Sequence, residues 1–226
     1  MKLEFNLPVP APADLSDTSK IWGTYYYVFA AASVTKGISL KGMNGADLGP
    51  QLSPKSWCLA GVEGTVAIKN SGAEPTVYNF AGQTGASQTS CAGYTSLSAG
   101  KVAALEKTRW KEAKGPYGDG AGKYILAPFR TLAVDRDTFS LGTVLYVPEA
   151  RGVSIKLPDG TSTKHDGYFF AGDVGGAIKG LHVDFFLGIT KSNPFKFITS
   201  ASSGKFNART VVNKAAIKFL KDLHSA

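Results

Sequence analysis

The sequence predicts a mostly β fold, either a barrel or a sandwich, with a few helices. Short segments rich in β-branched and aromatic residues recur along the chain between turn-forming residues, which is typical of such folds. The 26 glycines in 226 residues exceed the usual share of about 7% and indicate many tight turns. A barrel of this length commonly remains one domain.

The first half of the chain predicts an extended lead-in, three strands and a helix. Residues 1–20 form the lead-in, because LPVPAPA at 7–13 carries three prolines. The strands are IWGTYYYVFAAASV from Ile21, GTVAIKN and PTVYNFAG, and a turn at 70–75 joins the last two. Residues 98–113 have a helical composition with Ser98 as the N-cap. We expect a single domain from residue 21 to residue 226.

The second half of the chain returns to strands before it ends in a helix. The predicted strands are YILAPFRTLAVD, GTVLYVPEA, GVSIKL, GYFFAGD and LHVDFFLG. The segment ARTVVNKAAIKFLKDL ends in an amphipathic helix whose apolar side includes Phe219, Leu220 and Leu223. The fold class predicted is therefore mostly β with peripheral helices, one of them C-terminal.

The charge balance favours polyanionic partners. The chain has 25 Lys and Arg against 17 Asp and Glu, a net charge of +8 and an isoelectric point near 9.4. Nucleic acid, an anionic lipid surface and an acidic cell wall all fit that charge. No run of five basic residues occurs, so we expect no nucleic-acid partner. No apolar run approaches the roughly 18 residues of a membrane span, so no integral membrane segment is expected.

The cysteines and the N-terminus bear on the compartment. Cys58 and Cys91 have no CxxC spacing and no nearby histidine, so no zinc site is expected. They are either free thiols or an oxidised pair, and the pair would fit a protein outside the cytoplasm. The first twenty residues lack the apolar region of a secretory signal peptide. A signal was removed, another export route is used, or the protein stays inside.

Three predicted strands carry aspartates at or near their ends. With a period of two, His182, Asp184 and Phe186 share one side of their strand, and Val183 and Phe185 face the other way. By the same reading, Thr131, Ala133 and Asp135 share a side. In GYFFAGD the residues that share a side are Phe169, Ala171 and Asp173.

The residue types between these aspartates exclude several chemistries. AGDVGGAIKG matches neither GxGxxG nor GxxxxGK[ST], and aspartates at both ends would repel phosphate. Calcium loops alternate their acidic ligands within one short segment, and serine hydrolases need GxSxG. Paired carboxylates acting on a carbohydrate remain, because an apolar pocket can keep a carboxylic acid protonated near neutral pH. Phe186 is on the side of Asp184 and can shield it.

The same residues resemble a known family. RTLAVDRDTFSLGTVLYVPEARG, followed by HDGYFFAGDVGGAIKGLHVDFFLG, resembles the three-aspartate (3D) domain of bacterial peptidoglycan lytic transglycosylases, the group that includes membrane-bound lytic transglycosylase A. The likeness is strongest over residues 124–190. Asp135, Asp173 and Asp184 fill the three aspartate positions. Val174 replaces the usual threonine, and Ser140 the usual proline.

The resemblance implies a double-psi β-barrel that cleaves the β-1,4 bond between N-acetylmuramic acid and N-acetylglucosamine, leaving a 1,6-anhydro end. It implies that Asp184 is the general acid and then the general base, with Asp173 as its electrostatic partner and Asp135 in support. No metal or other cofactor is expected. Residues expected to contact the substrate are Gly175, Gly176, Lys179, Gly180, His182 and Tyr25, with Tyr26 as the alternative to Tyr25 for stacking on a sugar ring.

The resemblance also implies a location and leaves two rival functions. The expected partner is the peptidoglycan glycan strand, bound by a monomer in the cell envelope. The first rival is a non-catalytic wall-binding or wall-loosening module, because expansin-like barrels also carry an H-x-D strand, here HVD at 182–184. The second is an unrelated barrel that acts as an interaction domain.

Overall fold

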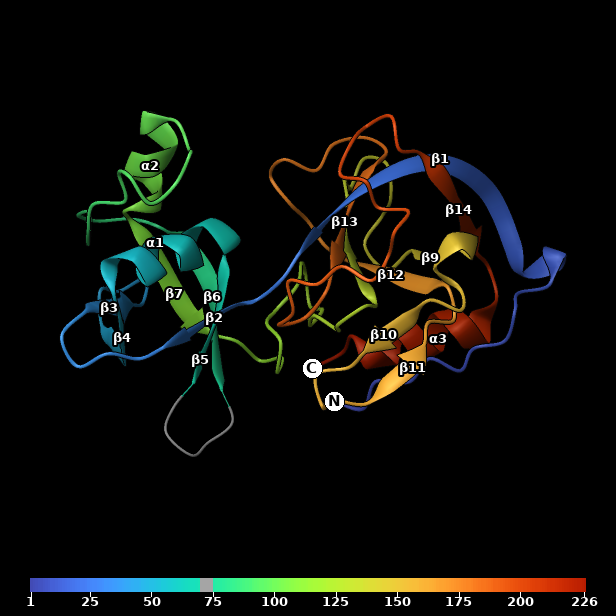
Figure 1. Ribbon diagram of the computed structural model, residues 1–226, viewed down its shortest axis with the longest axis horizontal. Coiled ribbons are helices and arrows are strands. Elements are labelled where there is room, and N and C mark those ends of the chain that lie inside the picture. The colour runs from blue at the N-terminus through green and yellow to red at the C-terminus, as the bar shows by residue number, and fades with distance from the viewer. Residues whose placement is uncertain (70–74) are drawn as a thin grey trace. The chain divides into compact units, whose positions relative to one another are not determined.

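The computed structural model describes residues 1–69 and 75–226, so the turn expected at 70–75 lies almost entirely outside the described residues. The chain divides into two compact units (Figure 1). The barrel unit comprises Met1–Tyr27 and Asp119–Ala226, and the sheet unit comprises Val28–Gly118. That the two units fold as the single domain expected from residue 21 stays a prediction.

The barrel unit contains most of the strands. Its strands, in chain order, are β1 (Leu15–Tyr26), β8 (Thr131–Ala133), β9 (Val144–Tyr146), β10 (Ser154–Lys156), β11 (Ser162–Lys164), β12 (Tyr168–Asp173), β13 (His182–Phe186) and β14 (Phe206–Val211). Its helices are two short 3-10 helices, Pro12–Asp14 and Pro148–Ala150, and the C-terminal helix α3 (Lys214–Leu223).

Six of these strands close into a barrel in the order β1-β13-β8-β12-β9-β14. The pairs β1–β13 and β8–β12 are parallel, and the other pairs are antiparallel. If β1 is exchanged with β12, β8 with β13 and β9 with β14, the order of the strands around the barrel is unchanged. This two-fold symmetry of the strand order is the connectivity of a double-psi barrel. The predicted fold class, a mostly β barrel with peripheral helices that include a C-terminal one, is confirmed.

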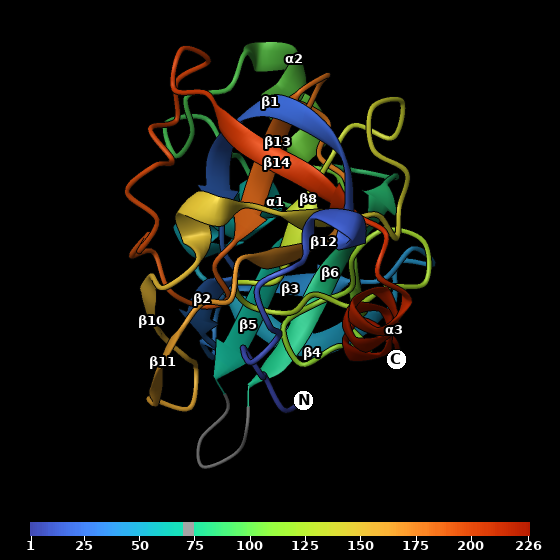
Figure 2. The same ribbon diagram turned by 90° about the vertical axis from the view of Figure 1, so that its right-hand side faces the viewer.

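Large aromatic side chains fill the barrel. Phe169, Phe185 and Phe206 lie in one core cluster with aliphatic residues from every barrel strand. Gly23 in β1 makes room for them, because a Cβ atom there would lie 2.8 Å from the Phe185 ring. On the outer face, Ala216 and Leu220 of α3 pack against β9, β12 and β14, and Figure 2 shows this helix beside the barrel.

Of the predicted lead-in, residues 1–20, only the first part lies outside the strands of the barrel. β1 begins at Leu15 and not at Ile21, because residues 15–21 pair with β14. The residues before it are anchored to a buried ion pair, in which both terminal nitrogens of Arg130 donate to Asp166, at 2.6 and 2.7 Å. Arg130 also donates to the carbonyl of Glu4, and the amide of Leu7 donates to Asp166. The N-terminal segment therefore belongs to the barrel unit.

The sheet unit combines two small sheets with two helices. Its elements are β2 (Phe29–Ala32), β3 (Ile38–Lys41), β4 (Asp47–Leu52), α1 (Pro54–Glu63), β5 (Thr65–Lys69), β6 (Thr76–Gln83), α2 (Ala99–Leu105) and β7 (Thr108–Glu112). The sheet order is β2-β5-β6-β7, with a separate β3–β4 pair. The helix expected over 98–113 is therefore wrong in its second half, where β7 pairs with β6.

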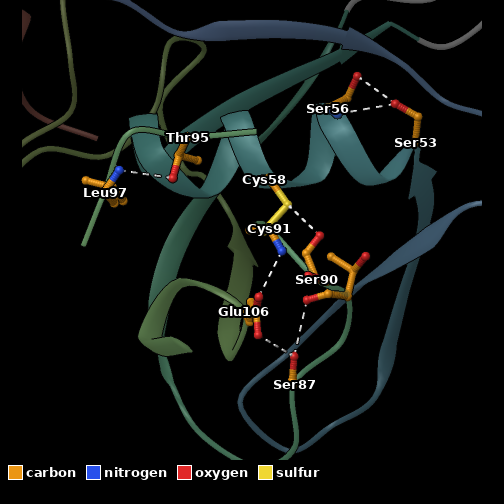
Figure 3. Close-up of a disulfide and its surroundings, with 10 residues drawn as sticks. Ser53, Ser56, Cys58, Ser87, Ser90, Cys91, Thr95, Leu97 and Glu106 are labelled. Carbon is orange, nitrogen blue, oxygen red and sulfur yellow. Dashed lines mark hydrogen bonds between the residues drawn. A yellow bond between two sulfur atoms is a disulfide. The ribbon is translucent and has the colours of Figure 1, made fainter. Parts of the chain in front are cut away.

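A disulfide between Cys58 and Cys91 fixes the core of the sheet unit (Figure 3). It ties α1 to the loop before α2, and of the two alternatives left by the sequence the structure has the oxidised pair. Glu106 holds the same loop, because its carboxylate accepts hydrogen bonds from the Cys91 amide and the Ser87 hydroxyl. Among the described residues, no helix is long and apolar enough to cross a membrane.

Candidate active site

Four residues form a row across the outer face of the barrel. Strand pairing sets Thr24 of β1 beside Asp184 of β13, Asp184 beside Ala133 of β8, and Ala133 beside Asp173 of β12. Neighbouring strands lie about 4.8 Å apart, so the two aspartate Cα atoms are separated by roughly 10 Å. Only the methyl group of Ala133 stands between the two carboxylates in this row.

A shift in strand register brings Asp173 into the row. Strict alternation assigns Asp173 to the side of Phe169 and Ala171, which face the barrel core. The pairing of β12 with β8 shifts between Ala171 and Asp173, so that Asp173 lies opposite Ala133. The side predicted for Asp173 is therefore wrong, and the reason is the bulge, which turns this carboxylate from the core face to the face of Asp184.

Asp173 is hydrogen-bonded and largely removed from water. The Tyr26 hydroxyl donates to its Oδ2 at 2.8 Å. The pKa of Asp173 is raised to about 6, mainly by burial and also by the nearby Asp184 charge, although the hydrogen bonds from Tyr26 and from the Val174 amide act in the opposite direction. Burial also raises the pKa of Tyr26 well above its usual range, with Asp173 adding to the effect. The phenol therefore stays neutral and donates to Asp173.

Asp184 accepts a hydrogen bond from the neighbouring strand. The Thr24 hydroxyl donates to Asp184 Oδ1 at 2.7 Å, and Thr24 Oγ1 also lies 2.9 Å from His182 Nε2. The His182 ring stacks on Trp22, with 3.7 Å between ring centroids and 6° between planes. His182, predicted as a site residue, thus lies beside Asp184 and within reach of its hydrogen-bond network.

Two side chains on β1, Trp22 and Thr24, were not among the predicted site residues, and Tyr26 was expected only as an alternative to Tyr25. Trp22, Thr24 and Tyr26 alternate along the strand, and each contacts a site residue on the same face. The period of two in WGTYY indicates that these three side chains share one face, but a segment so rich in aromatic residues is first interpreted as part of the core. By the same alternation Tyr25, a predicted sugar contact, faces away from Thr24 and Tyr26. Its side chain is therefore not on the face of the strand that carries the contacts with the aspartates.

Phe186 provides the apolar side of the site. It is 1% exposed, and its ring lies 5.0 Å from the ring of Tyr26. Both residues follow the polar pair Thr24 and Asp184 on neighbouring strands. Phe186 therefore places an apolar ring beside the end of the row where Tyr26 meets Asp173, and both of these residues are only half-buried.

Asp135 lies outside the row and holds a loop. It follows β8 in a turn, where its Oδ2 accepts a hydrogen bond from the Gly180 amide at 2.8 Å. That bond, then one from the Asp137 amide, lowers the pKa of Asp135, and Lys179 contributes. Among the described residues, no group of three or more acidic, histidine or cysteine side chains could hold a metal ion. The three aspartates therefore do not converge on one point.

The glycine-rich segment at 174–181 is the loop that Asp135 holds. Gly180 has a φ of +58°, which favours glycine, and a Cβ at Gly175 would lie 2.7 Å from Ile178. A Cβ at Gly176 would meet nothing within 4 Å. The side chains of Val174 and Lys179 are exposed. Gly176 and Lys179 thus present open surface next to the row, and contact with substrate stays a prediction for all four glycine and lysine candidates.

Comparisons with known proteins point to one family. Residues 130–194 match the family model described as the 3D domain. Among solved structures, MltA from Neisseria gonorrhoeae is similar with a TM-score of 0.55 at 13% identity, over 87% of this chain and 74% of that chain. A membrane-bound lytic murein transglycosylase from Agrobacterium tumefaciens gives 0.52 at 13% identity, over 88% and 76%.

E. coli MltA with bound chitohexaose gives a TM-score of 0.51 at 18% identity, over 84% of this chain and 71% of that chain. No curated protein sequence matches the chain. The matched residues contain Asp135, Asp173 and Asp184, as the sequence resemblance predicts. Residues 130–194 therefore resemble a 3D domain, and the chain has the fold of the MltA lytic transglycosylases.

Proposed function

We propose that this protein is a peptidoglycan lytic transglycosylase that cleaves the β-1,4 bond between N-acetylmuramic acid and N-acetylglucosamine. The observation that carries the proposal is the row of Thr24, Asp184, Ala133 and Asp173 on the outer face of the barrel. Two carboxylates with only a methyl group between them offer a glycan both a proton donor and a negative charge.

In the proposed reaction Asp184 acts as the general acid and then as the general base. Its carboxyl group first protonates the oxygen that leaves the muramyl C1 atom. The carboxylate then takes the proton of the muramyl C6 hydroxyl, which attacks C1 and closes the 1,6-anhydro ring. Because the nucleophile belongs to the substrate, no positioned water is required.

Asp173 would act through its charge. Its carboxylate, held by Tyr26, would stabilise the positive charge that develops on the sugar ring. The pKa of Asp173, raised to about 6 mainly by burial, means that this charge is present above about pH 6 and lost below it. The supporting contribution of the charge therefore declines on the acid side of neutrality. Asp135 would act at a distance, by fixing the loop that contains Gly175, Gly176, Lys179 and Gly180.

The partner and location follow from the same proposal. E. coli MltA was solved with chitohexaose, a β-1,4-linked glycan, and a related substrate here would be the glycan strand of peptidoglycan. The Cys58–Cys91 disulfide favours an oxidising compartment, in agreement with a role in the cell envelope. The net charge of +8 favours an acidic wall, and we propose a monomer as the active form.

Digestion of purified peptidoglycan tests the reaction. The products of the wild-type protein are analysed by mass spectrometry for 1,6-anhydromuropeptides, which only lytic cleavage forms. Asp184→Asn should lower their rate of formation by at least about a hundredfold, because acid and base catalysis are both removed. Asp17→Asn is the matched control, since Asp17 is exposed on β1 outside the row.

Two results would overturn the proposal. Muropeptides with reducing ends would indicate hydrolysis, and bound but uncleaved peptidoglycan would indicate the expansin-like alternative. Circular dichroism of Asp184→Asn provides the check on folding, because the side chain lies on the outer face and its loss should leave the spectrum unchanged.

A further inference from the structure

The proposed acid is joined to a histidine through a single hydroxyl group. Thr24 Oγ1 lies 2.7 Å from Asp184 Oδ1 and 2.9 Å from His182 Nε2. Thr24 pairs with Asp184, and Trp22 pairs with His182, so all four side chains share the outer face of β1 and β13. The stacked indole of Trp22 fixes the orientation of the His182 ring. The geometry is that of a chain of two hydrogen bonds.

A hydroxyl group has one hydrogen, so the two bonds cannot be set independently. When Thr24 donates to Asp184, His182 Nε2 must donate to Thr24. When the Asp184 carboxyl is protonated and donates to Thr24, Thr24 must donate to Nε2. The two arrangements differ by the position of one proton, which is on His182 in the first and on Asp184 in the second.

The other ring nitrogen decides what these states are. A hydrogen bond with the Ala177 backbone favours the charged form of His182, although burial has the larger effect and lowers its pKa. A hydrogen bond favours the charged ring when the ring donates it, so the ring donates to the backbone carbonyl of Ala177. Because Thr24 contacts Nε2, the nitrogen that donates to this carbonyl is Nδ1. The first state is then an imidazolium beside a carboxylate, and the second a neutral imidazole beside a neutral acid.

We propose that Thr24 and His182 form a proton relay that loads Asp184, an inference that rests on the function proposed above. The Nε2–H bond breaks as Thr24 Oγ1 takes that hydrogen, and the Thr24 O–H bond breaks as Asp184 Oδ1 takes the other. One proton moves from His182 to Asp184, and the threonine hydroxyl is restored. Thr24 and His182 are positioning residues, because both act on the sugar through Asp184.

Other titratable groups face this pair from the neighbouring strands. Asp173 faces it from β12 and Tyr26 from β1, whereas β8 presents the uncharged Ala133. Tyr26 remains neutral because burial raises its pKa, and Arg136 acts on Asp173. In the adjoining loop, Lys179 acts on Asp135. Asp173 titrates near pH 6, so the measurements are repeated with Asp173→Asn to separate its titration from that of the relay.

Titration of His182 by NMR tests the relay without any substrate. The chain has three histidines, and burial lowers the pKa of His165 to about 3 and that of His224 to about 4, so these two are flat references between pH 5 and 8. Thr24→Val removes only the hydroxyl and should lower the His182 midpoint by roughly half a unit to one unit. Thr24→Ser should restore it, and Thr18→Val on the exposed part of β1 is the matched control.

A double-mutant cycle separates the relay from simple charge attraction. Asp184→Asn should shift the His182 midpoint in the protein with Thr24 and have a clearly smaller effect when Thr24→Val is also present. The relay is wrong if Thr24→Val leaves the midpoint unchanged, or if the two shifts add. Because Thr24→Ser retains a hydroxyl in nearly the same shape, it keeps the test valid even if the valine variant misfolds.

Kinetics provide the second measurement. Thr24→Val should lower the rate of 1,6-anhydromuropeptide formation by roughly ten- to a hundredfold and displace its pH profile, and Thr24→Ser should recover both. A lower rate with an unchanged profile would reduce Thr24 to a structural residue and overturn the relay. Absence of these products with the wild-type protein would instead refute the proposed reaction, while the NMR titration would still decide the relay.

Discussion

The barrel unit and the sheet unit differ in the polar groups that they bury. The barrel unit buries three histidines and the Arg130–Asp166 ion pair, and it holds Asp173 in the candidate active site. The buried polar side chains of the sheet unit, among the described residues, are Thr65, Asn79, Thr108 and Arg109, and its core is crossed by a disulfide. We therefore expect the barrel unit to respond to pH and the sheet unit to respond to redox conditions.

The direction of the pH response follows from the pKa shifts. Burial lowers the pKa of His165 to about 3 and that of His224 to about 4. Burial alone would raise the pKa of Asp166, but Arg130 lowers it overall. The stability that depends on the two neutral histidines is present at neutral pH and is lost as the pH falls from their ordinary pKa of 6.5 toward these values. The stability that depends on the Asp166 carboxylate is lost only as the pH falls below its ordinary pKa of 3.8. The barrel unit should therefore unfold in acid, with Asp173 as an exception of opposite sign.

The largest expected effect is that of breaking the buried ion pair. Arg130→Met leaves the Asp166 carboxylate buried without its partner and should reduce the free energy of unfolding of the barrel unit by about 3–5 kcal/mol at pH 7. Denaturant unfolding followed by the NMR signals of His165 and His224, which lie in the barrel unit, measures this loss. Lys218→Met on the exposed side of α3 is the control. A loss below about 1 kcal/mol would contradict the stated importance of the pair.

Removing the disulfide should produce the next largest effect, confined to the sheet unit. Replacing Cys58 and Cys91 by alanine opens a loop with a sequence separation of 33 and should cost about 3–4 kcal/mol. The fluorescence of Trp57 and Trp110, both buried in that unit, reports its unfolding once Trp22 of the barrel unit is replaced by phenylalanine. Reductant should lower the midpoint of the wild-type sheet unit and leave that of the barrel unit unchanged. Equal shifts in both units would contradict the contrast between them.

Asp173→Asn should stabilise the barrel unit at neutral pH. The folded pKa of about 6 lies above the ordinary value of 3.8, so ionisation of Asp173 opposes folding above pH 6. The substitution should raise the free energy of unfolding by on the order of 1–3 kcal/mol at pH 8, and the gain should vanish as the pH falls below 4. Denaturant unfolding at several pH values measures it. A gain that increases in acid would have the wrong sign.

The smallest expected effect is that of Asp135→Asn. The substitution weakens the acceptor of the Gly180 amide, so hydrogen exchange at Gly180 should become faster while the unfolding midpoint changes little. Asp137→Asn, in the same turn but exposed, is the matched control. A large loss of global stability would show that Asp135 supports the barrel and not only the loop.

The sequence was sufficient where the structure depends on local periodicity. The outward face of Asp184, the C-terminal helix and the strands around the aspartates follow from periods of two and 3.6. The side of Asp173 could not be predicted, because the bulge depends on how β12 pairs with β8. The strand β7 was missed because its pairing with β6 overrides the helical composition of residues 108–112. The pairing of the cysteines could not be predicted either, because it depends on which segment of the chain lies beside α1.

Two of the site residues, Trp22 and Thr24, were missed for another reason, and Tyr26 was expected only as an alternative to Tyr25. An isolated strand rich in aromatic residues does not reveal which neighbour it will have, and β1 meets β13 only through a parallel pairing across the chain. That pairing brings a distant threonine to Asp184 and a distant indole to His182. No spacing within either segment encodes these contacts.

The exchange that leaves the barrel connectivity unchanged also acts on the row of site residues. It maps β1 onto β12 and β13 onto β8, so that Thr24 corresponds to Asp173 and Asp184 corresponds to Ala133. The scaffold thus offers two equivalent positions for an acid, and only one of them carries it. Under the proposed function, a glycan strand, whose reducing and non-reducing ends differ, would meet this one-sided pair productively in a single orientation only.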